Sequence, residues 1–475
     1  MRGRPYRRDL LRMAACGFGS LALSGLLHEQ ARGEQPPRAK DPLSPKPPHL
    51  VPRAKRVIFL FMQGGPSQVD TFDHKPALFE SDGKNIDFVG VRFGTFGKKS
   101  QRRLMRPLWC FERYGQCGQR VSDLFPHVAQ HVDDLCLLHG MHTEGVAHGP
   151  STLFLHTGAT NLVRPSMGSW ITYGLGTENE NLPGYITLGP SASKGGPRNH
   201  SNGFLPTAYQ GTAMGRAGQP AVEATIRHLT DPGRSARSGE DRYSLLQALN
   251  RSQRAATPGD DRLDAVIGSF ELAYRMQKHA PALLGLSRET PATLELYGIG
   301  KKPTDDFGRR CLQARRLAEA GVRYIQVNYA DESPTPRWDQ HSNMPRHAEH
   351  ARATDKPVAG LLADLKQRGL LEDTLVWWGG EFGRTPFAQG KNGRDHNPRG
   401  FTVWLAGAGV KPGFSYGATD EIGHEAVEGR VHMHDLHATL LHMLGLDHER
   451  LTYRYAGRDF RLTDVHGEVV HPILA

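Results

Sequence analysis

The sequence predicts an α/β protein with a central, mostly parallel β-sheet flanked by helices. Helical periodicity at 305–320 leads into one apolar run, and a helix over about 355–368 leads into the next. Strands that alternate with helices in this way form parallel sheets. Four such runs, rich in β-branched and aromatic residues, have the composition of buried strands: 57–62, 324–329, 374–378 and 401–405.

Length and charge limit the class of protein. The 475 residues can bury a large core, enough for one big domain or two. The net charge is +10, of which +3 falls in residues 1–30, where five Arg oppose Asp9 and Glu29; the remainder therefore carries about +7. We find no nucleic-acid motif and no clustered basic helix, so we expect a mildly basic surface that favours anionic substrates and no nucleic-acid partner.

The N-terminus has the pattern of a targeting segment. Paired Arg7 and Arg8 precede an apolar run at 13–27 that is too short for a comfortable membrane span. The pattern resembles a twin-arginine signal, which exports folded proteins, and we assign it to 1–31. Because no clean cleavage site is visible, a membrane anchor stays open as the alternative. We expect a periplasmic or otherwise exported protein that meets the twin-arginine export machinery, with the membrane involved only through this segment.

The remaining chain is expected to be a linker at 32–54, rich in Pro, Lys and Arg and without packed structure, followed by a single domain at 55–475. Residues 190–260 mix Gly, Pro, Arg and Ser, the composition of a loop-rich insertion over the site. No C-x-x-C spacing occurs, so we do not expect a cysteine zinc site. Cys110 and Cys117 are candidates for a disulfide after export.

Acids and histidines follow the predicted strands. Asp339 and His341 follow the strand at 324–329, Glu381 follows the strand at 374–378, and Asp395 with His396 precedes the strand at 401–405. Ligands of open α/β sheets bind outside the carboxyl ends of the strands. Carboxylate and imidazole together suit a divalent metal. The alternative is a set of solvated loops whose acids cap helices or pair with nearby arginines, and the coincidence at three strand ends favours the metal.

A polar segment at 141–152 supplies a second set of candidates. A helix that starts near Pro150 places Ser151 and Thr152 at its N-terminus, where backbone N–H groups favour an anion. Ser151 is accordingly a candidate nucleophile, and an ordinary helix cap is the alternative. His432 or His434, in the C-terminal histidine run, is expected near the site.

With these residues in view, the chain resembles the DUF1501 family of exported bacterial proteins. The resemblance covers nearly the whole chain and rests on the signal RRDLLR and on the segments FLFMQGGPSQVDTFDHKP, RPSMGSWITYGLG, WDQHSN, LVWWGGEFGRTP, GRDHNPRG and HDLHATLLHMLGLD. That family is similar in turn to the alkaline phosphatase superfamily, which includes sulfatases and metal-dependent phosphomutases. The resemblance implies an alkaline-phosphatase-like fold with loop-rich insertions, in which Glu381 takes the place of a metal-binding Asp and His396 that of a ligand His.

The chain also departs from the superfamily pattern. Sulfatases need Cys or Ser in a C/S-x-P-x-R motif, and the nearest stretch here has His148 at the nucleophile position and Thr152 in place of Arg. This argues against a formylglycine mechanism. Phe382 stands where relatives have a further ligand, so the resemblance implies either one metal where relatives have two or a weakened site.

These observations predict an exported, metal-dependent hydrolase of phosphate or sulfate esters, sulfatase-like but without formylglycine. Its substrate would be an anionic small-molecule or polysaccharide ester. Arg384 would offset charge on the transferred group, beside Ser151 or Thr152. The alternative is a non-catalytic, metal-containing protein that binds an anionic polysaccharide. The cofactor is a divalent ion, zinc, manganese or calcium, and its expected ligands are Asp339, His341, Glu381, Asp395 and His396.

Overall fold

The first predicted strand, β1 (Arg56–Met62), lies inside a sheet of nine strands in the computed structural model, which describes residues 41–89, 99–226, 236–257 and 259–475. The order across the sheet is β14, β6, β13, β10, β1, β9, β7, β8, with β17 paired to β6. The other bounds are β6 Leu135–His142, β7 Tyr185–Leu188, β8 Thr212–Met214, β9 Tyr324–Tyr329, β10 Thr374–Gly379, β13 Phe401–Ala406, β14 Phe414–Tyr416 and β17 Val431–His432.

Strand direction decides which loops meet. β10, β1, β9, β7 and β8 are parallel neighbours, whereas β13 runs antiparallel to both β10 and β6. β6 therefore points the same way as β1, and its carboxyl end lies at the same edge as theirs. The start of β13 lies at that edge too. The predicted fold class, α/β with a central and mostly parallel sheet, is confirmed.

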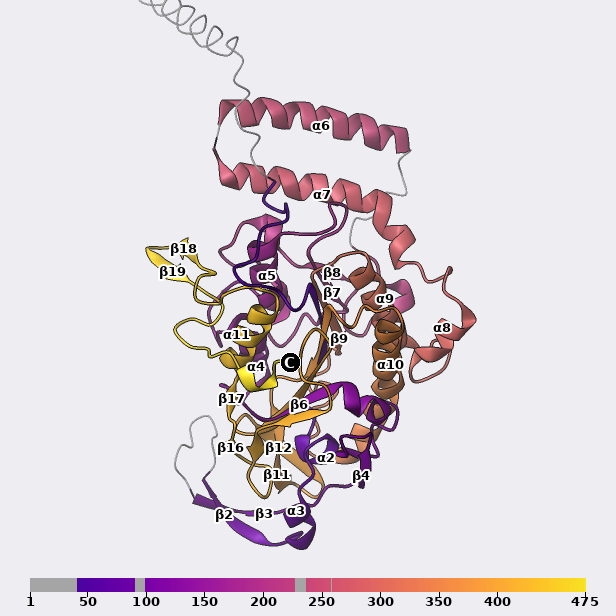
Figure 1. Ribbon diagram of the computed structural model, residues 1–475, viewed down its shortest axis with the longest axis vertical. Coiled ribbons are helices and arrows are strands. Elements are labelled where there is room, and N and C mark those ends of the chain that lie inside the picture. Colours follow the sequence, from indigo (N-terminus) through magenta and orange to yellow (C-terminus); the bar gives the residue numbers. More distant parts are fainter. Residues whose placement is uncertain (1–40, 90–98, 227–235, 258) are drawn as a thin grey trace, which may run out of the picture. The chain divides into compact units, whose positions relative to one another are not determined.

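Helices cover both faces of the sheet. Figure 1 shows α4, α5 and α11 on one side and α9 and α10 on the other. A hairpin of two long helices, α6 and α7, occupies the middle of the chain, and α8 follows it. The bounds are α2 Gln68–Thr71, α3 Pro76–Glu80, α4 His148–Thr157, α5 Met167–Leu175, α6 Ala236–Ala256, α7 Asp261–Leu284, α8 Pro291–Leu296, α9 Asp305–Glu319, α10 His347–Gln367 and α11 Met433–Met443.

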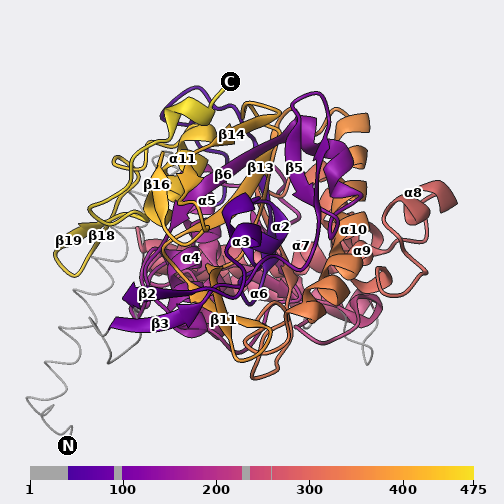
Figure 2. The same cartoon turned by 90° about the horizontal axis from the view of Figure 1, so that it is seen from below.

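Five two-stranded hairpins complete the described part of the fold. The hairpin β11/β12 lies beside α2 and β3 (Figures 1 and 2), and it carries residues of the site described below. The bounds are β2 Asn85–Val89, β3 Lys99–Arg103, β4 Phe111–Tyr114, β5 Gln119–Ser122, β11 Gly383–Gln389, β12 Gly393–Asn397, β15 Ala418–Thr419, β16 Ala426–Glu428, β18 Tyr453–Tyr455 and β19 Arg458–Phe460.

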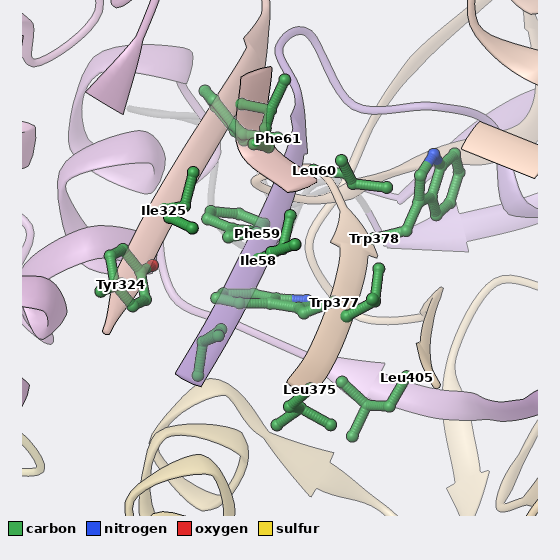
Figure 3. Packing of buried hydrophobic residues seen from close by; sticks show 14 of the residues in the cluster. Ile58, Phe59, Leu60, Phe61, Tyr324, Ile325, Leu375, Trp377, Trp378 and Leu405 are labelled. Atoms are coloured by element: carbon green, nitrogen blue, oxygen red, sulfur yellow. The ribbon is translucent and has the colours of Figure 1, made fainter. Parts of the chain in front are cut away.

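Side-chain packing explains why the apolar runs become central strands. Every residue of β1, β9, β10 and β13 is buried, as in strands covered on both faces. Phe59 stacks on Trp377 with ring centroids 3.7 Å apart (Figure 3), and Trp378 stacks on Trp404 at 5.9 Å. Aromatic side chains bury the largest apolar areas, so these contacts favour the observed strand neighbours over other pairings.

Two segments differ from the sequence-based expectation. The periodicity at 121–132 predicts a helix, but β5 pairs with β4 there and only a 3-10 helix at Val128–Asp134 follows, because Pro126 interrupts the stretch. Residues 41–54, expected to be unpacked linker, lie against the body instead: backbone N–H groups of Lys46, Leu50 and Ala54 donate to carbonyls at residues 175, 445 and 443. The predicted signal at 1–31 lies outside the described residues.

The expected disulfide is not formed, since Cys110 and Cys117 are both exposed free thiols. Cys110 directly precedes β4, whereas Cys117 sits in the turn at the far end of the β4/β5 hairpin. At about 3.3 Å per residue, at least roughly 13 Å of strand separates them. A disulfide needs Cα atoms within about 7 Å, so this hairpin would have to open first.

Within the described ranges, no helix combines the length and the apolar character that crossing a membrane requires.

Candidate metal centre

Four side chains from three different strand connections converge at the edge of the sheet. Asp339 and His341 lie in the loop after β9, His148 is the first residue of α4 after β6, and His396 lies in β12, just before β13. Their ligand atoms all lie within 4.8 Å of one another. The strand directions account for this meeting, since the ends of β6 and β9 and the start of β13 share one edge.

The distances within this cluster fit a single metal ion. Nε2 of His341 lies 2.9 Å from Asp339 Oδ1 and 3.0 Å from Nε2 of His396. Nε2 of His148 lies 3.2 Å from Asp339 Oδ2, and Nε2 of His396 lies 3.3 Å from Asp339 Oδ1. Tetrahedral coordination at about 2.1 Å requires ligand atoms roughly 3.4 Å apart. The three imidazoles and the carboxylate therefore fit a small divalent ion with modest adjustment.

The second nitrogen of each of the three imidazole rings contacts an oxygen atom, which orients the ring. Ligating histidines typically place their second ring nitrogen on a carboxylate or carbonyl, which fixes the tautomer and leaves the other nitrogen free for the metal. All three rings follow this rule: Nδ1 of His148 faces Glu381 Oε1 at 2.5 Å, Nδ1 of His396 faces the carbonyl of Val146 at 2.7 Å, and Nδ1 of His341 faces Gln389 Oε1.

Glu381, expected to be a metal ligand, contacts His148 and not the centre itself. It does not belong to the cluster of four, and it is fully buried between His148 and the backbone. The N–H of Gly64 donates to both carboxylate oxygens, at 3.0 and 3.1 Å. Gly64 has φ +110°, and a Cβ there would lie 2.7 Å from the backbone N of Asp339, so this close approach requires glycine.

Arg384, expected to face the substrate, donates a hydrogen bond to Asp339 instead. Its side chain is fully buried. Nη2 donates to Asp339 Oδ1 at 2.7 Å and to the carbonyl of Gly64, while Nε donates to Gly65 at 3.0 Å and Nη1 to Arg394 at 3.2 Å. Four of its five N–H groups are used in this way, and the side chain is fully buried, so the guanidinium does not face a transferred phosphate or sulfate.

Without a metal, the ring nitrogens of the cluster can donate hydrogen bonds to Asp339, and the pKa shifts are those of this metal-free state. Burial by itself would raise the pKa of Asp339, but hydrogen bonds from the three histidines and the charge of Arg384 hold it well below its usual range. Burial would lower the pKa of His148, yet its hydrogen bonds to Asp339 and Glu381 raise it. Burial, together with nearby Arg384 and His148, lowers the pKa of His396 to about 4. Asp339 is therefore a permanent anion, and His396 is a neutral imidazole at neutral pH.

Phe382 closes the neighbouring position where the superfamily resemblance implies a second ligand. Its ring is buried, with its centroid 4.4 Å from the ring of His396 and 5.0 Å from that of His148. An aromatic ring has no electron pair suited to a hard divalent ion. The described residues accordingly contain one cluster able to hold a metal.

Ser151 and Thr152 are not at the helix terminus. α4 starts at His148, so the N–H of Ser151 already donates to the carbonyl of Ala147 at 3.0 Å. Both side chains are fully buried, and neither hydroxyl makes a hydrogen bond within the part of the chain described. Gly145 covers Ser151, since a Cβ on that glycine would lie 2.7 Å from Oγ. A nucleophilic or anion-binding role is therefore not supported at either position.

The remaining candidates lie near the centre or in the core. Asp395 is about one-third exposed, with Oδ1 3.7 Å from Nδ1 of His341. His434 packs against Phe154, and its Nε2 contacts the carbonyl of Gly158 at 3.1 Å, so it serves to pack α11 on α4.

The sequence analysis did not include His148 among the candidate ligands. Its signal was present, because His148 follows the apolar run at 135–138, which begins β6, as Asp339 follows the run at 324–329. The superfamily resemblance places His148 at the nucleophile position, which suggests a different role for this residue. Metal-binding and nucleophilic residues share the same edge, so position alone does not separate the two roles.

Fold and site together define an α/β protein with a histidine–aspartate cluster whose geometry is able to hold a metal ion. The chain belongs to the family described as "Protein of unknown function (DUF1501)", whose model matches residues 54–474. No curated protein matches this chain.

Several solved structures resemble it. The lipoteichoic acid synthase LtaP from Listeria monocytogenes shares 10% identity and a TM-score of 0.38, with 90% of this chain and 79% of that one covered. The PsFucS1 sulfatase from Pseudoalteromonas sp. shares 13% identity and a TM-score of 0.34, with 74% and 66% covered. A member of the alkaline phosphatase superfamily from Vibrio parahaemolyticus shares 10% identity and a TM-score of 0.35, with 87% and 72% covered. At these values, similarity says nothing about this chain's activity.

Proposed function

We propose that this protein is an exported, metal-dependent hydrolase of phosphate or sulfate esters. One observation carries the proposal: three imidazoles and Asp339 present their ligand atoms to a common point, and an oxygen fixes each ring from behind. The donor set favours zinc or manganese over calcium, which prefers six to eight oxygen ligands.

The residues around the centre have separable tasks. Glu381 accepts a hydrogen bond from Nδ1–H of His148. This tautomer keeps the lone pair on Nε2, which is directed at the centre. Arg384 holds Asp339 in place and maintains its negative charge. When bound, the metal supplies a Lewis acid that polarises an ester oxygen and lowers the pKa of a coordinated water.

One side of the centre is open to a substrate. The side chains of His341 and Asp395 are 31% and 32% exposed, whereas those of His148 and Glu381 are 8% and 0% exposed. An ester must therefore approach past His341. Asp395 is the carboxylate on that open side, and it is placed to accept a proton from a water molecule there. Hydrolysis by water needs no nucleophilic side chain, which agrees with the covered hydroxyl of Ser151.

Substrate and location rest on the family resemblance and the N-terminal pattern. We infer an anionic substrate, either a small-molecule ester or an esterified polysaccharide, from the basic balance of the chain. Export through the twin-arginine machinery would allow the metal to be acquired before the protein leaves the cytoplasm.

The test compares metal content and turnover. Purified wild type, His341→Ala and the control Glu421→Ala, an exposed acid remote in sequence from the centre, are analysed by mass spectrometry for zinc and manganese. Each is then assayed on p-nitrophenyl phosphate and p-nitrophenyl sulfate. We expect about one metal per chain and turnover in the wild type and control, with both lost in His341→Ala. Turnover that survives metal removal would overturn the proposal.

One observation favours the second candidate, a non-catalytic metal protein that binds an anionic polysaccharide. Four protein ligands complete the tetrahedral shell of zinc, as in structural sites, whereas catalytic zinc usually keeps a position open. Stoichiometric metal and binding to a sulfated polysaccharide, with no turnover on either aryl ester, would favour this candidate.

A further inference from the structure

The hairpin β11/β12 contacts two of the four side chains in the candidate metal centre. It carries His396 on β12, and Oε1 of Gln389, at the end of β11, contacts Nδ1 of His341. The Nε2 atoms of the two histidines lie 3.0 Å apart. The position of this hairpin therefore bears on both rings and on the distance between them.

The loop that carries His341 is also joined to β12 through its backbone. The N–H of Arg394 donates to the carbonyl of Gln340 at 3.1 Å, on one side of the ligand residue. On the other side, the N–H of Met344 donates to the carbonyl of Asn392 at 2.9 Å. His341 thus lies between two backbone links to the same short strand.

Gly393 is the point of closest approach between β12 and this loop. A Cβ at Gly393 would lie well inside the 3.0 Å that real Cβ atoms keep, against the carbonyl of His341 and the backbone N of Ser342. The φ angle of Gly393 is not positive, so the close contact, and not the backbone conformation, requires glycine here. The atoms in the way belong to the backbone and cannot rotate aside as a flexible side chain could.

The strand is held more firmly than the loop. The guanidinium of Arg394, next to Gly393, is fully buried, with Nε donating to Asp70 at 2.7 Å and Nη1 donating to the carbonyl of Thr385 at 3.2 Å. These contacts anchor the start of β12. A methyl group at Gly393 would therefore displace the backbone of His341, whose side chain is 31% exposed, away from the strand that carries His396.

On the basis of the metal centre in the proposed function, we propose that Gly393 is a positioning residue that makes this centre selective for small divalent ions. It allows His341 to lie close to His396, and a small ion with short bonds needs ligand atoms that are close together. A wider pair of imidazoles would disfavour zinc more than cadmium, a larger ion of the same charge that also binds imidazole.

The test measures metal affinity alone, without turnover. Zinc and cadmium are titrated against a chromogenic chelator with the purified full chain, as wild type and as Gly393→Ala. We expect zinc affinity to fall by about 10–100-fold, the range for residues that orient metal ligands, and cadmium affinity by about threefold at most. Gly149→Ala is the matched control, because this glycine follows the ligand His148 and a Cβ there meets open space. It should match wild type for both ions.

A second variant removes the contact with His341 without adding bulk. Gln389→Ala frees the ring from β11, so it should lower the preference for zinc in the same direction as Gly393→Ala but less. It decides the question if Gly393→Ala does not fold.

The ratio of zinc to cadmium affinity separates positioning from a general loss of stability, which would weaken both ions equally. Wild-type zinc binding with an unchanged ratio in both variants overturns the role of Gly393 and leaves the proposed hydrolase standing. So do equal losses for the two ions in Gly393→Ala. A wild type that binds neither ion overturns both proposals.

Discussion

Oε1 of Glu381 lies 2.5 Å from Nδ1 of His148, and the other nitrogen of the same ring faces the metal-binding cluster. A carboxylate that accepts a hydrogen bond from one ring nitrogen of a histidine sets the tautomer of that ring. It also increases the basicity of the other ring nitrogen. Glu381 is held in turn by the N–H of Gly64, so β1, β10 and α4 are joined through this one carboxylate.

The first prediction concerns Glu381. Glu381→Gln should reduce zinc affinity by about 10–100-fold while metal still binds one per chain, because the carboxamide orients His148 more weakly. His148→Ala should lose far more affinity. Both are measured by competition against a chromogenic chelator, with Glu421→Gln as the matched surface control. Equal losses in Glu381→Gln and His148→Ala would instead indicate that Glu381 is itself a ligand.

The second prediction concerns metal removal. An ion that binds only the folded chain stabilises it by RT ln(1 + [L]/Kd), about 2.7 kcal/mol at a metal concentration of 100 Kd. Adding zinc to chelator-treated protein should therefore raise the melting temperature of wild type. His341→Ala should show little increase, because one of its four ligands is missing. Differential scanning calorimetry of the two proteins, with and without zinc, decides the matter; equal increases would contradict the assigned ligand set.

The third prediction concerns the hydroxyls of α4. Ser151→Ala and Thr152→Val should leave metal content and turnover unchanged, because both side chains are buried and Gly145 covers Ser151. Stability should be equal or slightly higher, since each substitution removes a buried hydroxyl that lacks a partner. Chemical denaturation and the aryl ester assays measure the two effects. A large loss of turnover with normal metal content would restore Ser151 as the nucleophile.

The fourth prediction concerns stability at acid pH. Burial lowers the pKa of His156 from 6.5 to about 4, and the neutral ring is held between the carbonyl of Thr152 and the side chain of Gln326. Below pH 6.5 the unfolded chain takes up a proton that the folded chain refuses until about pH 4. The free energy of unfolding should therefore fall as pH drops through this window, by up to about 1.4 kcal/mol per pH unit for this one residue.

Urea denaturation between pH 7.5 and 5 measures that slope. His156→Gln, which cannot titrate, should show a smaller slope than wild type, and the exposed His279→Gln should match wild type. Buried His437, with a pKa lowered to about 3, adds to the slope in all three proteins. Identical slopes in wild type and His156→Gln would contradict the prediction.

The fifth prediction compares two arginines on α9. Arg315 is buried and contacts Glu289, Glu319 and Asp364 at 2.7–2.9 Å, whereas Arg309 pairs with Asp305 and is 25% exposed. Arg315→Ala removes these contacts, although Arg316 still pairs with Glu289 and Arg368 with Asp364, so it should destabilise the fold by about 1.5–3 kcal/mol. Arg309→Ala should cost less than about 1 kcal/mol. Similar losses in urea denaturation would show that Arg315 is not a structural anchor.

Much of the fold could be predicted from the sequence because burial on both faces leaves a local signature. The strand at 324–329 was predicted to the residue, and those at 57–62, 374–378 and 401–405 to within one residue at each end. The stretch 121–132 failed for a local reason. Its apolar residues suit a helix or a strand equally, and Pro126 with pairing to β4 decided against the helix.

The site was predicted only in part. Asp339, His341 and His396 were expected to meet, and in the structure they do so together with His148. The sequence offered no means to separate a ligand from the carboxylate behind it, and Glu381 and His148 are 233 residues apart. Nor could it show that Arg384 points inward, because that depends on three backbone carbonyls, two in the distant turn at Gly64 and Gly65 and one in β12.

The sequence by itself determined the sheet, its buried strands and the set of acids and imidazoles at their ends, since each of these follows from hydrophobic pattern and turn residues within a short window. The tertiary structure alone decided which of those groups face one another, because strand direction brings the ends of β6 and β9 and the start of β13 to one edge. What each of these residues can still bind depends on which of its atoms already contact neighbouring residues, and this too only the tertiary structure shows.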